Sequence, residues 1–140
     1  MVNAPITGTG LAGASAGINI DAPSGNVTTK GLKAHSTGDR AWGTVDANFA
    51  TGTININGVI DFVGTQAMFS PRAANVNLND NVDMVAPSFA RLAVQAADNI
   101  RVLGNVRIQE AGGGIAQALY QFGNDGKFGH HKVTAGPGGA

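Results

Sequence analysis

The chain contains no cysteine, so neither disulfide bonds nor a thiolate metal site can hold its fold together. Charge is also scarce: Asp, Glu, Lys and Arg make up 13% of the 140 residues, and nine basic side chains balance nine acidic ones. A chain without net charge lacks both the attraction to phosphate backbones and the self-repulsion that keeps small domains apart. We therefore expect no nucleic acid partner, and we expect the protein to associate.

Long hydrophobic runs are missing as well. Glycine and amide residues interrupt every apolar stretch before it reaches the ~18 residues of a membrane span. The first residues carry no positive charge followed by a continuous apolar segment, so they do not read as a secretory signal peptide. We expect no membrane partner, and we expect the chain not to be secreted by the general route.

What the chain does have is a period of two. Such a period is typical of a β-sheet with one buried and one wet face, because successive side chains of a strand point to opposite faces. The odd positions between residues 54 and 108 are mostly amides and small residues. The large apolar residues fall mainly on even numbers: Ile54, Ile56, Ile60, Phe62, Met68, Val76, Leu78, Val82, Met84, Leu92, Val94, Ile100, Val102, Val106 and Ile108.

Turn-forming residues divide the chain into predicted strands at 17–20, 27–34, 42–49, 53–63, 66–69, 75–85, 90–96, 99–109 and 115–122. This spacing predicts an all-β jelly roll or β-sandwich of about eight short antiparallel strands. Residues 88–97 also fit a short helix capped by Ser88, but the even phase of Leu92 and Val94 favours a strand. We expect one domain at 18–128, with flexible Gly/Ala-rich arms at 1–17 and 129–140.

A β-helix is the alternative architecture. The triplets 55–57, 77–79 and 104–106 resemble rungs in which stacked amides form ladders. Gly58, Asp80 and Gly104 repeat at a spacing close to a rung length, but the sequences between them share no further pattern. The jelly roll therefore remains the main prediction.

No sequence motif indicates a particular catalysed reaction. Residues 13–17 match G-x-S-x-G and residues 8–13 match a dinucleotide fingerprint, but neither lies in the strand and helix context that its chemistry needs. The oxygen-rich run 75–83 lacks the spacing of a calcium loop, and the histidines lack metal-ligand spacing. We expect no enzyme activity, no catalytic residue, no cofactor and no bound metal.

The candidate residues are therefore interaction residues. Trp42 is a core residue or a binding hot spot, since tryptophan serves in both roles. Three arginines on the polar phase of their strands are a candidate docking set, and a run of asparagines is either an amide ladder or a binding surface. These candidates are Arg91, Arg101, Arg107, Asn75, Asn77, Asn79 and Asn81.

A cysteine-free chain with small-residue arms, Asn-rich alternating strands and the sequence 136–139 (Gly-Pro-Gly-Gly) resembles the capsid cement, or decoration, proteins of tailed bacteriophages. The likeness is to the jelly-roll cement proteins of podophages such as those of Bordetella. It implies a jelly roll that forms a homodimer on the outer capsid surface and clamps neighbouring copies of an HK97-like major capsid protein. It also implies synthesis in the host cytoplasm and a final location in the virion.

Two other functions fit the same residues. One is a trimeric β-helical segment of a phage tail spike, a fibre or an adhesin. The other is a carbohydrate-binding β-sandwich module in which Trp42, and with it Tyr120, provides a stacking platform. Aromatic residues are only 6% of the chain, which limits how many platforms it can offer.

Overall fold

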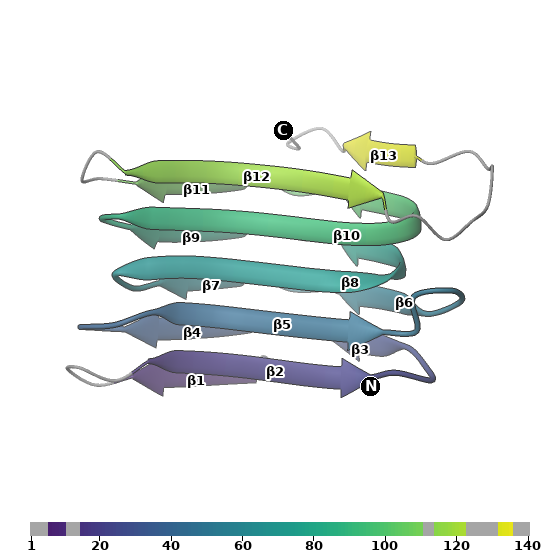
Figure 1. The fold of residues 1–140 in the computed structure, drawn as a ribbon, viewed down its shortest axis with the longest axis horizontal. Helices are drawn as coiled ribbons and strands as arrows, with labels where there is room; N and C mark the ends of the chain where they lie inside the picture. Colours follow the sequence, from purple (N-terminus) through teal and green to yellow (C-terminus); the bar gives the residue numbers. More distant parts are fainter. Residues whose placement is uncertain (1–5, 11–14, 111–113, 123–131, 136–140) are drawn as a thin grey trace.

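The alternating strands wind in one direction into a stack of coils. We describe a computed structural model that covers residues 6–10, 15–110, 114–122 and 132–135. Every strand pairing in these residues is parallel. Figure 1 shows the coils lying one above another, with β1 and β2 at one end of the stack and β11 and β12 at the other. The fold is a β-solenoid.

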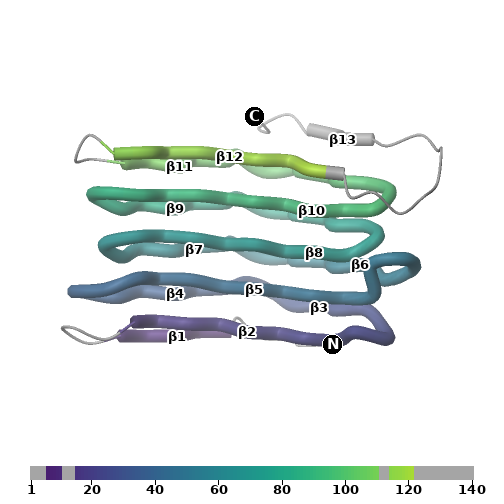
Figure 2. The backbone as a smooth tube through the Cα atoms, in the orientation of Figure 1, coloured from purple at the N-terminus to yellow at the C-terminus, as the bar shows by residue number. Residues whose placement is uncertain are grey.

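One side of each coil belongs to a five-stranded sheet, with the strand order β1-β4-β7-β9-β11. The tube in Figure 2 follows the chain from β7 and from β9 around a tight corner into β8 and β10 of the opposite sheet. The strands are β1 (Ile6–Gly10), β4 (Leu32–Ser36), β7 (Ile60–Val63), β9 (Val82–Ala86) and β11 (Val106–Glu110).

The opposite side belongs to an eight-stranded sheet whose main order is β12-β10-β8-β5-β2. Shorter strands extend it along a third side, where β3 pairs with β6, β6 with β8, and β13 with β10. The strands are β2 (Ala16–Ala22), β3 (Val27–Thr29), β5 (Ala41–Ala47), β6 (Thr53–Ile56), β8 (Gln66–Leu78), β10 (Phe89–Val102), β12 (Ile115–Phe122) and β13 (Lys132–Ala135).

The predicted antiparallel jelly roll is therefore wrong, and the β-helix alternative fits. Both folds bury every second residue, so the period of two could not separate them. Each strand here pairs with the strand one coil away, and side chains bonded across coils are 22 to 27 residues apart in the sequence. The spacing of Gly58, Asp80 and Gly104 was the true coil repeat: a Cβ at Gly104 would collide with the backbone of Asp80 in the coil below.

The core lies between the two sheets and is built from columns of equivalent residues. One column contains only alanine, which is buried in four of its five positions and exposed at Ala116 in the last coil. In the next column, the fully buried ring of Phe69 meets the fully buried ring of Phe62 from the opposite sheet at 5.4 Å between centroids. Gly43 leaves room for both rings, since a Cβ there would lie 2.7 Å from Phe62 Cζ. The alanine column is Ala16, Ala41, Ala67, Ala90 and Ala116.

The long strands β8 and β10 bend from one side of the coil to the next. At each bend two consecutive alanines are fully buried, Ala73 with Ala74 and Ala96 with Ala97, which breaks the alternation for one residue. In β10 the pairing register shifts at the same place. The even phase predicted for residues 54–108 is interrupted at the preceding corner too, so Phe69 is buried and Met68 faces outward.

The predicted domain limits can be placed on this fold. The segment 1–17, expected as an arm, contains β1 and the first residues of β2, which pair with β4 and β5. Of the segment 129–140, the structure describes only β13. The strand predicted at 90–96 is confirmed, because these residues lie in β10 and form no helix.

Candidate ligand-binding face

The outer face of the eight-stranded sheet carries three rows of side chains that run across the coils. Each of β2, β5, β8, β10 and β12 contributes one outward residue to each row, because the strands are parallel and in register. The first row is Gly17, Trp42, Met68, Arg91 and Gln117. The second row is Asn19, Thr44, Ser70, Ala93 and Leu119. The third row is Asp21, Asp46, Arg72, Gln95 and Gln121.

Trp42 is an outward residue of the sheet, flanked in the chain by the buried Ala41 and Gly43. Its indole covers Gly17 of the neighbouring coil: a Cβ at Gly17 would lie 2.5 Å from Trp42 Cε2 and 3.0 Å from Nε1. Only glycine lets the ring rest on the sheet in this way. Trp42 is therefore not a core residue, and its side chain is partly exposed.

A shallow groove runs beside this indole. Its first part has a volume of about 270 Å³ and is lined by Arg40, Trp42, Gly43, Thr44, Met68 and Ser70. Its second part, about 220 Å³, shares Thr44 and Ser70 with the first and continues to Asp46, Arg72, Gln95 and Gln121. We call the two parts together the Trp42 groove. It combines an aromatic and a thioether surface with hydroxyl, amide and charged groups.

The charged side chains that line the groove, Arg40, Asp46 and Arg72, form no ion pair among the described residues. Arg40 is exposed at the start of β5. The neighbouring carboxylate of Asp39 accepts a hydrogen bond of 2.8 Å from Ser15 Oγ, and this bond, with the backbone N–H of Arg40, lowers the pKa of Asp39 below its ordinary range. The guanidinium of Arg72 lies 4.0 Å from the centre of the Phe49 ring.

On the other two outer faces, polar side chains bond to one another across coils, as Thr44 does to Asn19 at 2.8 Å on the groove face. On the five-stranded sheet His35 Nε2 lies 2.9 Å from Asp61 Oδ2, and Arg107 donates two hydrogen bonds, of 2.8 and 3.0 Å, to Asp83. Arg107 and Asp83 form an ion pair, and both contacts join one coil to the next.

The predicted asparagines lie on the third side, where they form the amide ladder. Asn77 donates to Asn55 at 2.8 Å, Asn79 donates to Asn57 at 2.8 Å, and Asn75 accepts from Asn99 at 2.7 Å. Asn81 Oδ1 accepts the backbone N–H of Asn105 at 2.8 Å. These amides are used to join coils.

The three predicted arginines do not lie together. Arg91 is in the first row of the outer face, beside Met68. Arg101 is at the other end of the same strand, beside Asn77, and Arg107 is on the five-stranded sheet. Arg91 is half-buried, and its Nε has no hydrogen-bond partner in the described structure. Of the three, only Arg91 is close to the Trp42 groove.

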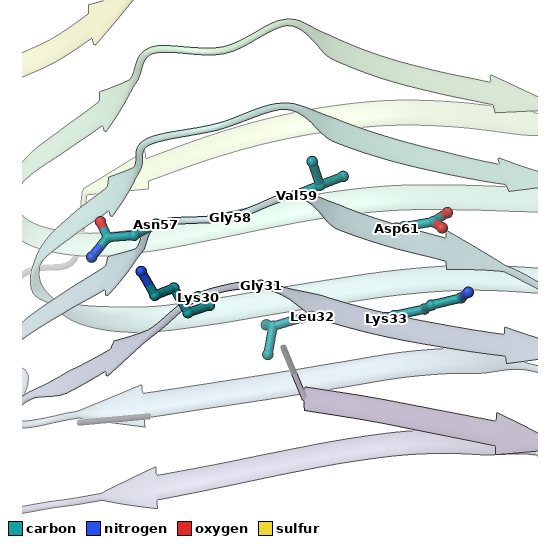
Figure 3. A pocket seen from close by; sticks show the side chains of 8 residues that line it. All are labelled: Lys30, Gly31, Leu32, Lys33, Asn57, Gly58, Val59 and Asp61. Carbon is teal, nitrogen blue, oxygen red and sulfur yellow. The ribbon is translucent and has the colours of Figure 1, made fainter. Parts of the chain in front are cut away.

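A second cavity of about 340 Å³ lies at the corner between the third side and the five-stranded sheet. It is lined by Lys30, Gly31, Leu32, Lys33, Asn57, Gly58, Val59 and Asp61. Figure 3 shows these side chains spreading apart: Lys30 and Asn57 lie at one end, Lys33 and Asp61 at the other, and Val59 projects outward. Because its polar groups do not converge on one point, this corner is a weaker ligand site than the Trp42 groove.

Sequence reasoning singled out Trp42 of the groove and Arg91 close to it but missed Arg40, Met68 and Ser70. Met68 was assigned to the even apolar phase, which the corner at Gly64 and Thr65 reverses. Of the G-x-S-x-G string, the structure describes Ser15, Ala16 and Gly17, and Ser15 bonds to Asp39. Tyr120, the second predicted platform, lies in the core register, and its burial raises the pKa of the phenol.

Within the described ranges, no group of three or more His, Asp or Glu side chains is placed to hold a metal ion. The same residues contain no helix long and apolar enough to cross a membrane. Comparison with known proteins finds no match for this chain among protein-family models, curated proteins or solved structures. The capsid-cement function and its HK97-like partner therefore stay predictions, and the jelly roll that the resemblance implied is not the fold.

Proposed function

We propose that this chain is a carbohydrate-binding β-solenoid, a non-catalytic recognition segment of the fibre or adhesin type. The observation that carries the proposal is the position of Trp42, which lies on the outer face of a sheet, over a glycine, at the edge of a groove. An indole packed in this way offers partly exposed apolar surface in a fixed orientation, as a stacking platform for a sugar ring requires.

The rest of the groove supplies what the polar groups of a sugar need. Ser70 provides a hydroxyl that both donates and accepts, Thr44 provides a hydroxyl that donates to Asn19 at 2.8 Å and can still accept, and Gln95 and Gln121 provide amides with donors and acceptors. Met68 continues the apolar surface one coil beyond Trp42. A sugar has apolar ring faces and a rim of hydroxyls, so this combination matches it better than it matches a wholly apolar ligand.

The solenoid also suits a polymeric ligand. Adjacent coils are spaced by about 4.8 Å, and each coil adds one residue to every row of the outer face. Stacked repeats create extended binding surfaces in this manner. The polar groups of the other sides bond from coil to coil, which keeps the stack rigid behind the groove.

Tryptophan fluorescence tests the proposal directly, because Trp42 is the one tryptophan of the chain. A glycan array probed with the labelled chain is expected to give hits, and each hit should change the emission of Trp42 on titration. Trp42→Ala should abolish array binding while the circular dichroism and the melting temperature stay close to those of the wild type.

Val59→Ala is the matched control, since Val59 is an exposed apolar side chain, 45% accessible, outside the Trp42 groove. It should bind the same glycans as the wild type. An array without hits, or a Trp42→Ala variant that binds unchanged, would show that the groove is not a carbohydrate site.

A further inference from the structure

The charges of the Trp42 groove are separated along its length. Arg40 lines the first part beside Trp42, and Arg91 follows Met68 in the same row. At the far end Asp46 stands in register between Asp21 and Arg72. Building on the proposed function, we infer that the groove binds an acidic glycan, with a sugar carboxylate held at Arg40 and the neutral hydroxyls directed toward Asp46.

The guanidinium of Arg40 is available for such a ligand. Among the residues that the structure describes, no carboxylate lies within ion-pair distance of it. Its nearest acidic neighbour, Asp39, is already engaged by Ser15 Oγ and by the backbone N–H of Arg40. A planar guanidinium with unused donors recognises a carboxylate through two parallel hydrogen bonds.

Arg91 extends the positive end of the groove across the sheet. Its row places it one strand beyond Met68 and two strands beyond Trp42, whereas Arg40 comes two residues before Trp42 in the chain. A sugar ring on Trp42 and Met68 would therefore have Arg40 beside it along the strand and Arg91 beside it across the sheet. Two cations at this end favour an anionic ligand.

The other end of the groove fixes the direction of the ligand. The carboxylates of Asp21 and Asp46 are neighbours in register, and Arg72, the only cation of their row, is stacked on Phe49. A ligand carboxylate at this end would face two carboxylates and one guanidinium, whereas hydroxyl groups can donate hydrogen bonds to Asp46. The acid is therefore assigned to the Trp42 end, whose lining contains Arg40 and no carboxylate.

Two pairs of probes test the inference with the full chain. The first pair is a galacturonic acid tetramer and the same tetramer as its methyl ester. The second is sialyllactose and its methyl ester. Titrations followed by Trp42 fluorescence should give, for at least one pair, about tenfold tighter binding of the free acid than of the ester, the difference expected of a hydrogen-bonded charge pair. The preference should weaken as salt is added, because Arg40 is exposed.

Arg40→Gln should remove this preference and leave binding of the esters unchanged. Arg101→Gln, which removes an exposed arginine of the same sheet outside the groove, should keep the preference. Gly17→Ala should weaken acid and ester alike, because the added methyl displaces the indole of Trp42. These three variants separate the charge effect from stacking and from net charge.

The outcomes distinguish the inference from the proposed function. Equal binding of acids and esters would overturn the acidic preference but leave a carbohydrate site in place. A preference lost in Lys30→Gln rather than in Arg40→Gln would move the acid to the corner cavity and overturn the assignment of Arg40. If neither the array nor any probe shows binding, the proposed function itself fails.

Discussion

The outer faces of the two sheets are built from the same kinds of side chain but use them differently. On the five-stranded sheet, outward polar side chains pair across coils, as Arg107 does with Asp83 and His35 with Asp61. On the eight-stranded sheet, Arg40 and the third-row carboxylates form no such pairs in the described structure, and the surface is hollowed beside Trp42. Polar groups that do not join coils are the ones open to a ligand.

The third side supports this comparison. Its asparagines were candidates for a binding surface, yet Asn75, Asn77 and Asn79 each bond to the same residue type in a neighbouring coil. Their regular spacing comes from the coil repeat, which a ladder of identical side chains requires. A regular run of polar residues in a solenoid can thus stabilise the stack of coils, and the ligand can bind on a face whose side chains repeat less regularly.

The largest expected effect is the difference between replacing a buried and an outward side chain of the eight-stranded sheet. Phe69→Ala should lower the free energy of unfolding by about 3–5 kcal/mol, because a fully buried ring that packs on Phe62 is lost. Met68→Ala, at the adjacent outward position, should cost less than about 1 kcal/mol but weaken glycan binding. Urea unfolding measures the first effect and Trp42 fluorescence the second.

The opposite result would contradict the assignment of Phe69 to the buried side of β8 and of Met68 to its outer side. If Met68→Ala unfolded the protein as readily as Phe69→Ala, the even-numbered stripe would continue through this strand, and the Trp42 groove would lose its thioether wall. Equal and small effects from both variants would show that neither side chain lies in the core.

The same strand shows how far sequence reasoning reaches. Most predicted strands coincide with observed ones, and the segment 115–122 matches β12 at both ends. Predicted strands such as 27–34 and 53–63 in fact span a corner between two strands. Such corners are only two or three residues long, so the sequence has no long loop to mark them. The alternation of buried and outward residues continues through some corners and reverses at others.

The coil repeat itself was present in the sequence but hidden. Inward columns accept different apolar residues, as with Ile54, Val76 and Ile100. Equivalent positions of the coils are therefore alike in hydrophobicity but not in residue type. The column of five alanines is the exception, because the same residue recurs in every coil. Aligning the chain on those alanines would have favoured the solenoid over the jelly roll. The groove could not be found in this way, since it depends on which outward residues become neighbours.

An intermediate effect tests whether the amide ladder stabilises the stack. Asn77→Ala should lower the free energy of unfolding by about 1 kcal/mol, because it removes the 2.8 Å bond to a partly buried Asn55. Gln117→Ala, on the outer face of β12, should change stability by less than about 0.5 kcal/mol. Chemical denaturation of the two variants compares the faces directly, and a larger loss for Gln117→Ala would undo the distinction between them.

The smallest effect concerns Asp39, the one groove-side carboxylate that has an internal partner. Its pKa lies below the ordinary value of 3.8, first because Ser15 donates to it and second because of the backbone N–H of Arg40. A lowered folded pKa means that the contact favours the folded state above the ordinary pKa and loses that effect as the pH falls through the lowered value.

Ser15→Ala should raise the pKa of Asp39 toward its ordinary value, as a carboxyl-detected NMR titration would show. The freed carboxylate would then be a closer competitor for the guanidinium of Arg40, so the variant should also bind the free-acid glycan slightly more weakly than the wild type. If Asp39 has the same pKa in both proteins, the hydrogen bond from Ser15 does not lower that pKa. Asp39 would then compete with the ligand for the guanidinium of Arg40 in the wild type as well.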